Sequence, residues 1–313
     1  MTVRPEPSTV RIDGPWAHRD VHANGIRLHV AETGEGPLVL MLHGFGEFWW
    51  GWRHQLTSLS DAGFRAVAVD LRGYGDSDKP PRGYDAWTLA GDVGGLIKSL
   101  GERKAHVIGH GWGGLLAWTA AALHPRLVHS VVAIGAPHPL ALRRQIRRTA
   151  LRRRENNQAR AIGTLFRGQI PMYPERKLVK DDAIAVEQLM RRWAGPEWAA
   201  GTDFQMAVER YRQAMRIGGV AFSAMEYYRW AVRSQVRSEG RRFTEALDKQ
   251  IQVPALRIHG ADDPVMLTAT AKASERWLDR DSPMHVLTEV GHYPHEEAPD
   301  FVNKTLKSWL SQH

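Results

Sequence analysis

Residues 109–114, which read Gly-His-Gly-Trp-Gly-Gly, carry the strongest chemical signal in the chain. They follow a short apolar run typical of a strand and precede a helix-like stretch, which is the setting of a nucleophile elbow. Small flanking residues let the helix pack closely against the strand there, and the central position is held on a tight turn. That position is Gly111, and we expect the backbone N–H of Trp112 to help form an oxyanion hole. The glycine pattern alone is weak, because Gly-rich strand-to-helix turns also bind phosphates.

Three further segments supply the other groups that nucleophilic catalysis needs, and each follows a strand-like run. The segment 43–45, His-Gly-Phe, would place the N–H of Phe45 as a second oxyanion donor. Asp262 and Asp263 follow a late strand and offer a carboxylate, and His292 follows the last strand and offers a base. The chain order of nucleophile, acid and histidine is that of the α/β-hydrolases.

Strand-like and helix-like segments alternate through most of the chain, which predicts an α/β fold with a mostly parallel sheet flanked by helices. Continuous apolar runs suit strands that are covered on both faces. The predicted strands are 38–42, 66–69, 105–108, 128–134, 255–258 and 284–290. The predicted helices are 51–59, 87–100, 112–123, 269–278 and 299–310.

The segment 138–247 breaks this alternation and differs in charge. It holds 22 basic and 11 acidic residues, a net of +11, whereas the rest of the chain holds 20 and 23, a net of −3. Its apolar positions have helical spacing, and prolines interrupt it. We therefore predict a core domain of residues 1–137 and 248–313, with a helical cap inserted at 138–247 and a pocket between the two.

Composition excludes several classes of protein. The 313 residues include no cysteine, which removes disulfide scaffolds, thiolate metal sites and cysteine nucleophiles. No apolar stretch approaches the roughly 18 residues of a transmembrane helix, and the first 16 residues lack the apolar run of a secretory signal. We expect a cytoplasmic protein without a transmembrane segment. The sequence does not determine the oligomeric state, and a homodimer is one of the alternatives.

Five ordered segments resemble the epoxide hydrolase branch of the α/β-hydrolases, over nearly the whole chain. That resemblance implies an elbow aspartate that opens an epoxide and forms an ester, a histidine–acid pair that activates water to hydrolyse it, and cap tyrosines that hold the epoxide oxygen. It implies neither a metal nor another cofactor. The matching segments are 43–45 (His-Gly-Phe), 49–55 (Trp-Trp-Gly-Trp-Arg-His-Gln), 70–80 (Asp-Leu-Arg-Gly-Tyr-Gly-Asp-Ser-Asp-Lys-Pro), 109–110 with 112–114, and 291–296 (Gly-His-Tyr-Pro-His-Glu).

Carried onto this sequence, the resemblance implies that His292 is the base. It implies that Asp263 is the acid, because the family spacing Gly-x-x-Asp selects it over Asp262, which is then a solvated turn residue. In the cap, Tyr228 matches an epoxide-holding tyrosine better than its neighbour Tyr227 does, although a packed helix aromatic is the alternative for this position.

Further residues are expected to bind the substrate. The resemblance implies a second cap tyrosine near Thr164, but this sequence has no tyrosine there. We expect Tyr173 to take its role. We expect Trp49 and Trp50 to wall an apolar substrate pocket with Phe45 and Trp112, although aromatic residues also fill cores. His110 adjoins the elbow and is expected to contact substrate rather than to replace the nucleophile.

The sequence departs from the family at the centre of the site, because Gly111 stands where the aspartate belongs. Glycine cannot form the ester, yet it adopts the elbow's positive φ without strain. Three interpretations stay open: catalysis has been lost, the chemistry has changed to use the remaining dyad, or the substitution was made to disable the protein.

Two functions therefore compete. The first is hydrolysis of a small apolar epoxide or related substrate, weak or by direct attack of a water that His292 activates. The alternative is a catalytically silent protein that binds a small molecule or a partner, and a different reaction of the dyad, such as proton abstraction or lyase chemistry, is a third option. The stretch 143–154 contains seven arginines, but it has neither interleaved aromatics nor a recognised nucleic-acid module. We therefore expect a solvated helix face rather than a nucleic-acid partner, with docking to an acidic membrane surface or partner as the alternative.

Overall fold

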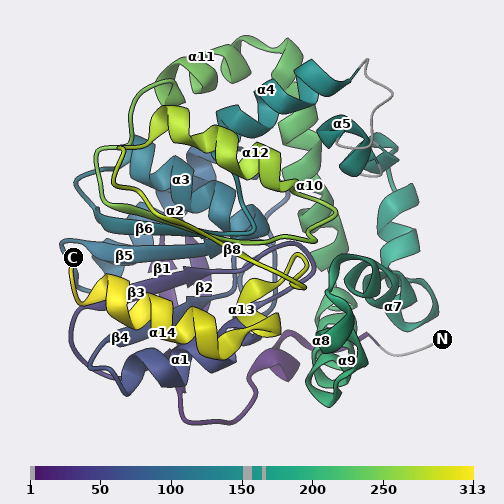
Figure 1. The fold of residues 1–313 in the computed structure, drawn as a ribbon. Coiled ribbons are helices and arrows are strands. Elements are labelled where there is room, and N and C mark those ends of the chain that lie inside the picture. Colours follow the sequence, from purple (N-terminus) through teal and green to yellow (C-terminus); the bar gives the residue numbers. More distant parts are fainter. Residues whose placement is uncertain (1–3, 151–156, 164–166) are drawn as a thin grey trace.

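A computed structural model describes residues 4–150, 157–163 and 167–313. Within these residues eight strands form one sheet in the order β1-β2-β4-β3-β5-β6-β7-β8 (Figure 1). The pairs from β4 to β8 are parallel, whereas β2 pairs antiparallel with both β1 and β4. The strands are β1 Ala17–Ala23, β2 Ile26–Thr33, β3 Leu38–Leu42, β4 Arg65–Val69, β5 Ala105–His110, β6 Val128–Ile134, β7 Ala255–Gly260 and β8 Met284–Leu287. The predicted mostly parallel α/β sheet is confirmed.

The two strands that the sequence did not predict, β1 and β2, form the antiparallel edge of the sheet. Only two of the seven residues of β1 are buried, so polar side chains interrupt its apolar pattern. By contrast, all residues of β3 are buried, and all but one of β6 are. Strands covered on both faces read as continuous apolar runs, and edge strands do not.

Helices cover both faces of the sheet. Figure 1 shows α1 and α14 on one face and α2 and α3 on the opposite face, with the sheet between them. This packing explains why the parallel strands are apolar throughout. The helices outside the insert are α1 Arg53–Ser60, α2 Ala86–Ser99, α3 Gly111–Leu123, α12 Thr268–Lys272, α13 Pro294–Glu297 and α14 Pro299–Leu310, with 3₁₀ turns η1 Pro7–Val10, η2 Trp49–Trp52 and η5 Ala273–Trp277.

A helical insert lies between β6 and β7, as the sequence predicts. Figure 1 shows its helices, in teal and green, gathered beside the sheet. The division into domains at 138 and 247 stays a prediction. The elements of the insert are α4 Pro139–Thr149, α5 Gln158–Ala161, η3 Arg167–Gln169, α7 Tyr173–Trp193, α8 Pro196–Ala200, α9 Thr202–Met215, α10 Val220–Arg233, η4 Ser234–Val236 and α11 Ser238–Leu247. Among all the helices described, none is long and apolar enough to cross a membrane.

Candidate active site

The elbow is built where β5 ends and α3 begins, at Gly111. The backbone of Gly111 has φ +51°, in the left-handed region that glycine adopts without strain. A Cβ at Gly109 would come within 2.1 Å of the carbonyl oxygen of Gly113, and a Cβ at Gly113 would come within 2.1 Å of the carbonyl oxygen of Leu42. The flanking glycines are therefore required by the close packing of α3 on β5 and β3.

A buried histidine–aspartate pair faces the elbow. The Nδ1–H of His292 donates to Oδ2 of Asp263 at 2.7 Å. The other carboxylate oxygen of Asp263 accepts from the backbone N–H groups of Val265 and Met266, at 2.8 and 2.9 Å. Because the proton lies on Nδ1, the Nε2 of His292 is left as the basic atom. The alternative acid, Asp262, is exposed.

The electrostatics of the pair favour an ionised aspartate. Burial alone would raise the pKa of Asp263, but the charge of His292 and its hydrogen bond, with smaller contributions from His259 and the backbone, lower this pKa below its ordinary value. A carboxylate held in this way orients the imidazole and stabilises the imidazolium that forms when Nε2 takes a proton.

The Nε2 of His292 points at the place where an elbow side chain would begin. A Cβ at Gly111 would lie 3.4 Å from this Nε2 and 3.7 Å from Cα of Gly44. The geometry of an elbow, a base and an acid is thus complete except for the atoms that glycine lacks.

A cavity of about 360 Å³ opens at this point between helices and loops of the core and the helices of the insert. Its walls are mostly apolar side chains from α3, α4, α10 and α11. The rings of Phe45 and Trp112, the two expected oxyanion residues, both line it, and both contact the ring of Tyr228 at centroid distances of 5.1 Å. The assignment of the N–H groups of Phe45 and Trp112 to an oxyanion hole stays a prediction.

The hydroxyl groups of the two adjacent cap tyrosines have different partners. The hydroxyl of Tyr227 donates to the carbonyl oxygen of Arg72 at 2.8 Å and so holds the insert to the core. Tyr228 also lines the cavity. Burial raises the pKa of the Tyr228 hydroxyl, and a hydrogen bond with Trp112 offsets this rise in part. The hydroxyl of Tyr228 therefore stays protonated at neutral pH and can donate a hydrogen bond into the cavity.

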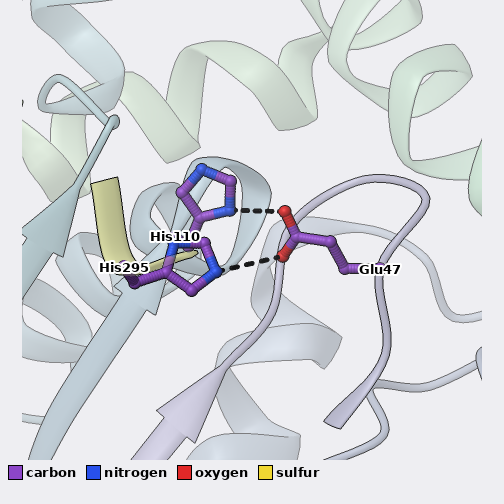
Figure 2. Close-up of side chains that lie close together, drawn as sticks. All are labelled: Glu47, His110 and His295. Atoms are coloured by element: carbon purple, nitrogen blue, oxygen red, sulfur yellow. Dashed lines mark ion pairs between the residues drawn. The ribbon is translucent and has the colours of Figure 1, made fainter. Parts of the chain in front are cut away.

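Behind the dyad lies a buried cluster of Glu47, His110 and His295 (Figure 2). Nδ1 of His110 is 2.7 Å from Oε1 of Glu47, and Nε2 of His295 is 4.0 Å from Oε2 of Glu47. The Nε2–H of His110 donates to the carbonyl oxygen of His292 at 2.7 Å, and Oε2 of Glu47 accepts from the N–H of Gly44 at 2.7 Å. The cluster thus ties the oxyanion loop, the elbow strand and the histidine loop together.

The three ligand atoms of this cluster lie within 4.8 Å of one another, so we compared it with a metal centre. Zinc binds nitrogen and oxygen ligands at 2.0–2.2 Å, which sets tetrahedral ligand atoms roughly 3.3 Å apart. The 2.7 Å between Glu47 and His110 is shorter and is that of a direct ion pair. Burial opposes the charge on each, but their mutual attraction raises the pKa of His110 and lowers that of Glu47 to about 2. The geometry favours a buried ion pair.

Three residues that we expected in the substrate site lie elsewhere, which corrects those expectations. Trp49 is buried in the core, where its Nε1–H donates to the carbonyl oxygen of Val10 at 2.7 Å. Trp50 packs under the guanidinium of Arg53, 3.9 Å from the ring centroid. Tyr173 is 56% exposed at the start of α7. These three aromatic residues lie in the core or at the surface, whereas Phe45 and Trp112 do line the cavity.

The expectation that His110 contacts substrate is also corrected, and the expectation near Thr164 is not tested. His110 is fully buried behind the dyad and does not line the cavity, so it contacts His292 and Glu47 rather than substrate. Thr164, near the expected place of a second cap tyrosine, lies outside the described residues.

The cavity also contains residues that the motifs did not indicate. Trp193, at the end of α7, lies with its ring centroid 5.5 Å from that of His292. Arg143 and Arg147 on α4 line the cavity beside the apolar Leu142 and Ile146. Helical spacing of apolar residues in α4 was visible in the sequence, but nothing there indicated that arginines on the neighbouring positions would face a cavity.

Comparison with known proteins places this site in a family. Residues 37–299 match the family model described as alpha/beta hydrolase fold. The AB hydrolase superfamily protein YfhM of Bacillus subtilis is 34% identical over 295 residues, which are 93% of this chain and 96% of that protein. Epoxide hydrolase 4 of Homo sapiens is 29% identical over 304 residues, 96% of this chain and 80% of that protein.

Solved structures agree with this placement. An epoxide hydrolase from Bacillus megaterium, in complex with an inhibitor, is similar with a TM-score of 0.80 at 27% identity, over 94% of this chain and 100% of that one. A mutant of a Bacillus megaterium epoxide hydrolase, in complex with a naphthyloxy-propane-1,2-diol product, gives a TM-score of 0.78 at 26% identity, over 94% and 100% of the two chains. This chain therefore belongs to the α/β-hydrolase fold family, within which it is epoxide-hydrolase-like.

Proposed function

We propose that this protein hydrolyses a small apolar epoxide by direct attack of a water molecule that His292 activates. One observation carries the proposal: Nε2 of His292 faces the empty side-chain position of Gly111 at 3.4 Å, while the hydrogen bond from His292 to Asp263 is intact at 2.7 Å. The base is in place for a nucleophile that the chain itself does not provide.

The steps follow from the positions of the side chains. The side-chain atoms that glycine lacks leave room comparable to one water, which occupies roughly 30 Å³ in the liquid. Nε2 of His292 takes a proton from this water as its oxygen attacks an epoxide carbon, and Asp263 stabilises the imidazolium. The carbon–oxygen bond breaks, and the hydroxyl of Tyr228 gives a proton to the leaving oxygen. The imidazolium then returns its proton to the tyrosinate through solvent, so water and epoxide yield a diol.

The chemistry of the cavity supports an apolar, aryl-bearing substrate. Phe45, Trp112, Trp193 and Tyr228 line the end of the cavity that contains His292. The similar Bacillus megaterium enzyme was crystallised with a product that carries a naphthyl ether. Aromatic walls bind aryl groups through large contact areas and edge-to-face packing.

A non-catalytic binding protein is the second candidate, and the absence of any side chain at Gly111 favours it. Such a protein would keep the cavity, and an apolar ligand would raise its melting temperature, because a ligand stabilises the state that binds it. It would form no diol from any epoxide.

Replacing His292 with glutamine tests the first candidate against the second. We expect His292→Gln to lower diol formation from an aryl epoxide by about 100-fold, because general base catalysis contributes about 10²–10⁴-fold. Diol formation from one aryl epoxide is measured by chromatography. Binding of the diol product is measured separately, by the shift in the melting temperature of the protein. Asp262→Asn is the matched control, since Asp262 is exposed next to the acid, and it should turn over at the wild-type rate. Ligand binding without turnover in the wild type would establish the second candidate.

A further inference from the structure

The cavity contains two cationic side chains from one helix, Arg143 and Arg147, in walls that are otherwise mostly apolar. We propose that these two arginines bind a carboxylate on the substrate, so that the protein takes an apolar molecule with one anionic end. The inference rests on the proposed function only in taking this cavity as the substrate site.

The cavity extends well beyond the dyad. Residues of α3 from Gly111 to Thr119 line the cavity. A helix rises 1.5 Å per residue, so the cavity follows α3 for about 12 Å from the elbow. Arg143 lies against α11, where its Nη1–H groups donate to the carbonyl oxygen of Gly240 at 3.4 Å and to the hydroxyl of Thr244. His292 instead lies at the elbow beside Trp193.

The face of α4 that lines the cavity combines apolar and cationic side chains. Pro139, Leu142 and Ile146 present apolar groups, and the two arginines stand one turn apart, at i and i+4. Side chains at this spacing lie on the same side of a helix. Arg143 is half-buried and Arg147 is exposed, so the pair spans the boundary between the cavity and solvent.

The charge of this pair is not neutralised by the cavity walls. Among the described residues that line the cavity, none is an aspartate or a glutamate. The Nε of Arg143 is buried and has no hydrogen-bond partner among the described residues. Burial and the charge of Arg147 both lower the pKa of Arg143. On α11, the carboxylate of Glu239 is already bonded to Nε1 of Trp230, at 3.0 Å.

A neighbouring arginine on the same helix shows the contrast. Arg144 has its guanidinium 3.4 Å from a carboxylate oxygen of Asp248 and 4.7 Å from the ring centroid of Trp277. It is not among the residues that line the cavity, and it has its own anionic partner. The arginine fork matches carboxylate geometry, and a desolvated arginine gains most from such a partner. An anion bound at the boundary between the cavity and solvent would be the ionic partner of Arg143 and Arg147, as Asp248 is the ionic partner of Arg144.

Binding of three ten-carbon probes tests the inference without any turnover. We expect decanoate to bind about tenfold more tightly than 1-decanol, because hydrogen bonds to charged groups are worth roughly that factor, and decylammonium to bind less tightly than 1-decanol. Quenching of tryptophan fluorescence reports binding, since Trp112, Trp193 and Trp230 line the cavity. Equal affinities of decanoate and 1-decanol in the wild type would overturn the proposal.

Substitution of the arginines assigns the effect. Arg143→Gln with Arg147→Gln should abolish the preference for decanoate and leave 1-decanol binding unchanged, whereas Arg144→Gln should keep the preference. Because Arg143 also bonds α11, Arg147→Gln alone is the second variant: its exposed side chain can be replaced without removing those bonds, and we expect about threefold weaker decanoate binding. A preference for decanoate that survives the double substitution would contradict the assignment.

The outcome is separable from that of the proposed function. Absence of a decanoate preference in a wild-type protein that does hydrolyse the epoxide would reject only the carboxylate site. A decanoate preference in a protein that forms no diol would keep the carboxylate site and reject hydrolysis.

Discussion

Replacing Gly111 with aspartate is expected to raise the turnover of an aryl epoxide by about 10³-fold or more. The first atom of the new side chain would lie 3.4 Å from Nε2 of His292, within the cavity that the aromatic residues wall. A positioned carboxylate supplies a nucleophile at high effective concentration and splits one difficult step into two easier ones. The φ of +51° strains any residue with a Cβ by about 1–2 kcal/mol, which aspartate tolerates better than most.

Two further variants separate the carboxylate from the backbone strain. Gly111→Ala carries the same strain without a nucleophile, and we expect no gain in turnover. The double variant Gly111→Asp with His292→Gln should form the ester and fail to hydrolyse it, so the intact mass of the protein should increase by that of the epoxide. A folded Gly111→Asp protein that neither gains activity nor forms this adduct with His292→Gln would show that the cavity does not hold an epoxide.

The second large effect concerns stability and the buried pair of Glu47 and His110. We expect Glu47→Gln to lower the free energy of unfolding by about 3–5 kcal/mol, because removing one partner of a buried ion pair leaves the other without compensation. Urea unfolding near pH 5.5 measures this change. Glu102→Gln is the matched control: its carboxylate lies 3.7 Å from Arg65 on the surface, and exposed pairs contribute about 0–1 kcal/mol.

The dependence of this effect on pH follows from the two pKa shifts. Glu47 has a folded-state pKa of about 2, below its ordinary value of 4.5. Its contribution to stability is therefore present above pH 4.5 and is lost as the pH falls from 4.5 towards 2. The pKa of His110 is raised above 6.5, so its contribution is complete below pH 6.5 and is lost as the pH rises through the raised pKa.

The difference between wild type and Glu47→Gln should thus be largest between pH 4.5 and 6.5 and should shrink on both sides. A variant whose free energy of unfolding stays within about 1 kcal/mol of the wild type at pH 5.5 would contradict the ion pair.

The parallel part of the fold could be predicted from the sequence, and the antiparallel edge could not. Strands β3 and β6 are sandwiched between helices, so burial on both faces leaves uninterrupted apolar runs whose ends mark the ends of the strands. In β1 the outward side chains meet solvent and the pattern is broken by arginine, aspartate and histidine. This strand belongs to the sheet because it pairs with β2 across a short turn, and its sequence contains no apolar run that would predict it.

The centre of the site was predictable because it follows strand ends. The elbow, the acid and the base each stand after a parallel strand, and such strands end at the same edge of the sheet. The walls of the cavity were less predictable, since they depend on how the insert packs. Trp49 and Trp50 adjoin the oxyanion loop in sequence but turn into the core, while Trp193 reaches the site from far along the chain. The arginine-rich stretch read as a solvated face, yet Arg143 and Arg147 line the cavity.

The source of the oxygen in a single turnover tests the central claim, that water attacks the epoxide without an enzyme ester. Protein in excess over an aryl epoxide is mixed in ¹⁸O-labelled water, and the diol is analysed by mass spectrometry. Direct attack of the water activated by His292 predicts one ¹⁸O atom in the diol formed during the first turnover. An unlabelled diol in that turnover, with ¹⁸O appearing in a carboxylate of the protein, would show that an ester forms and would contradict the account.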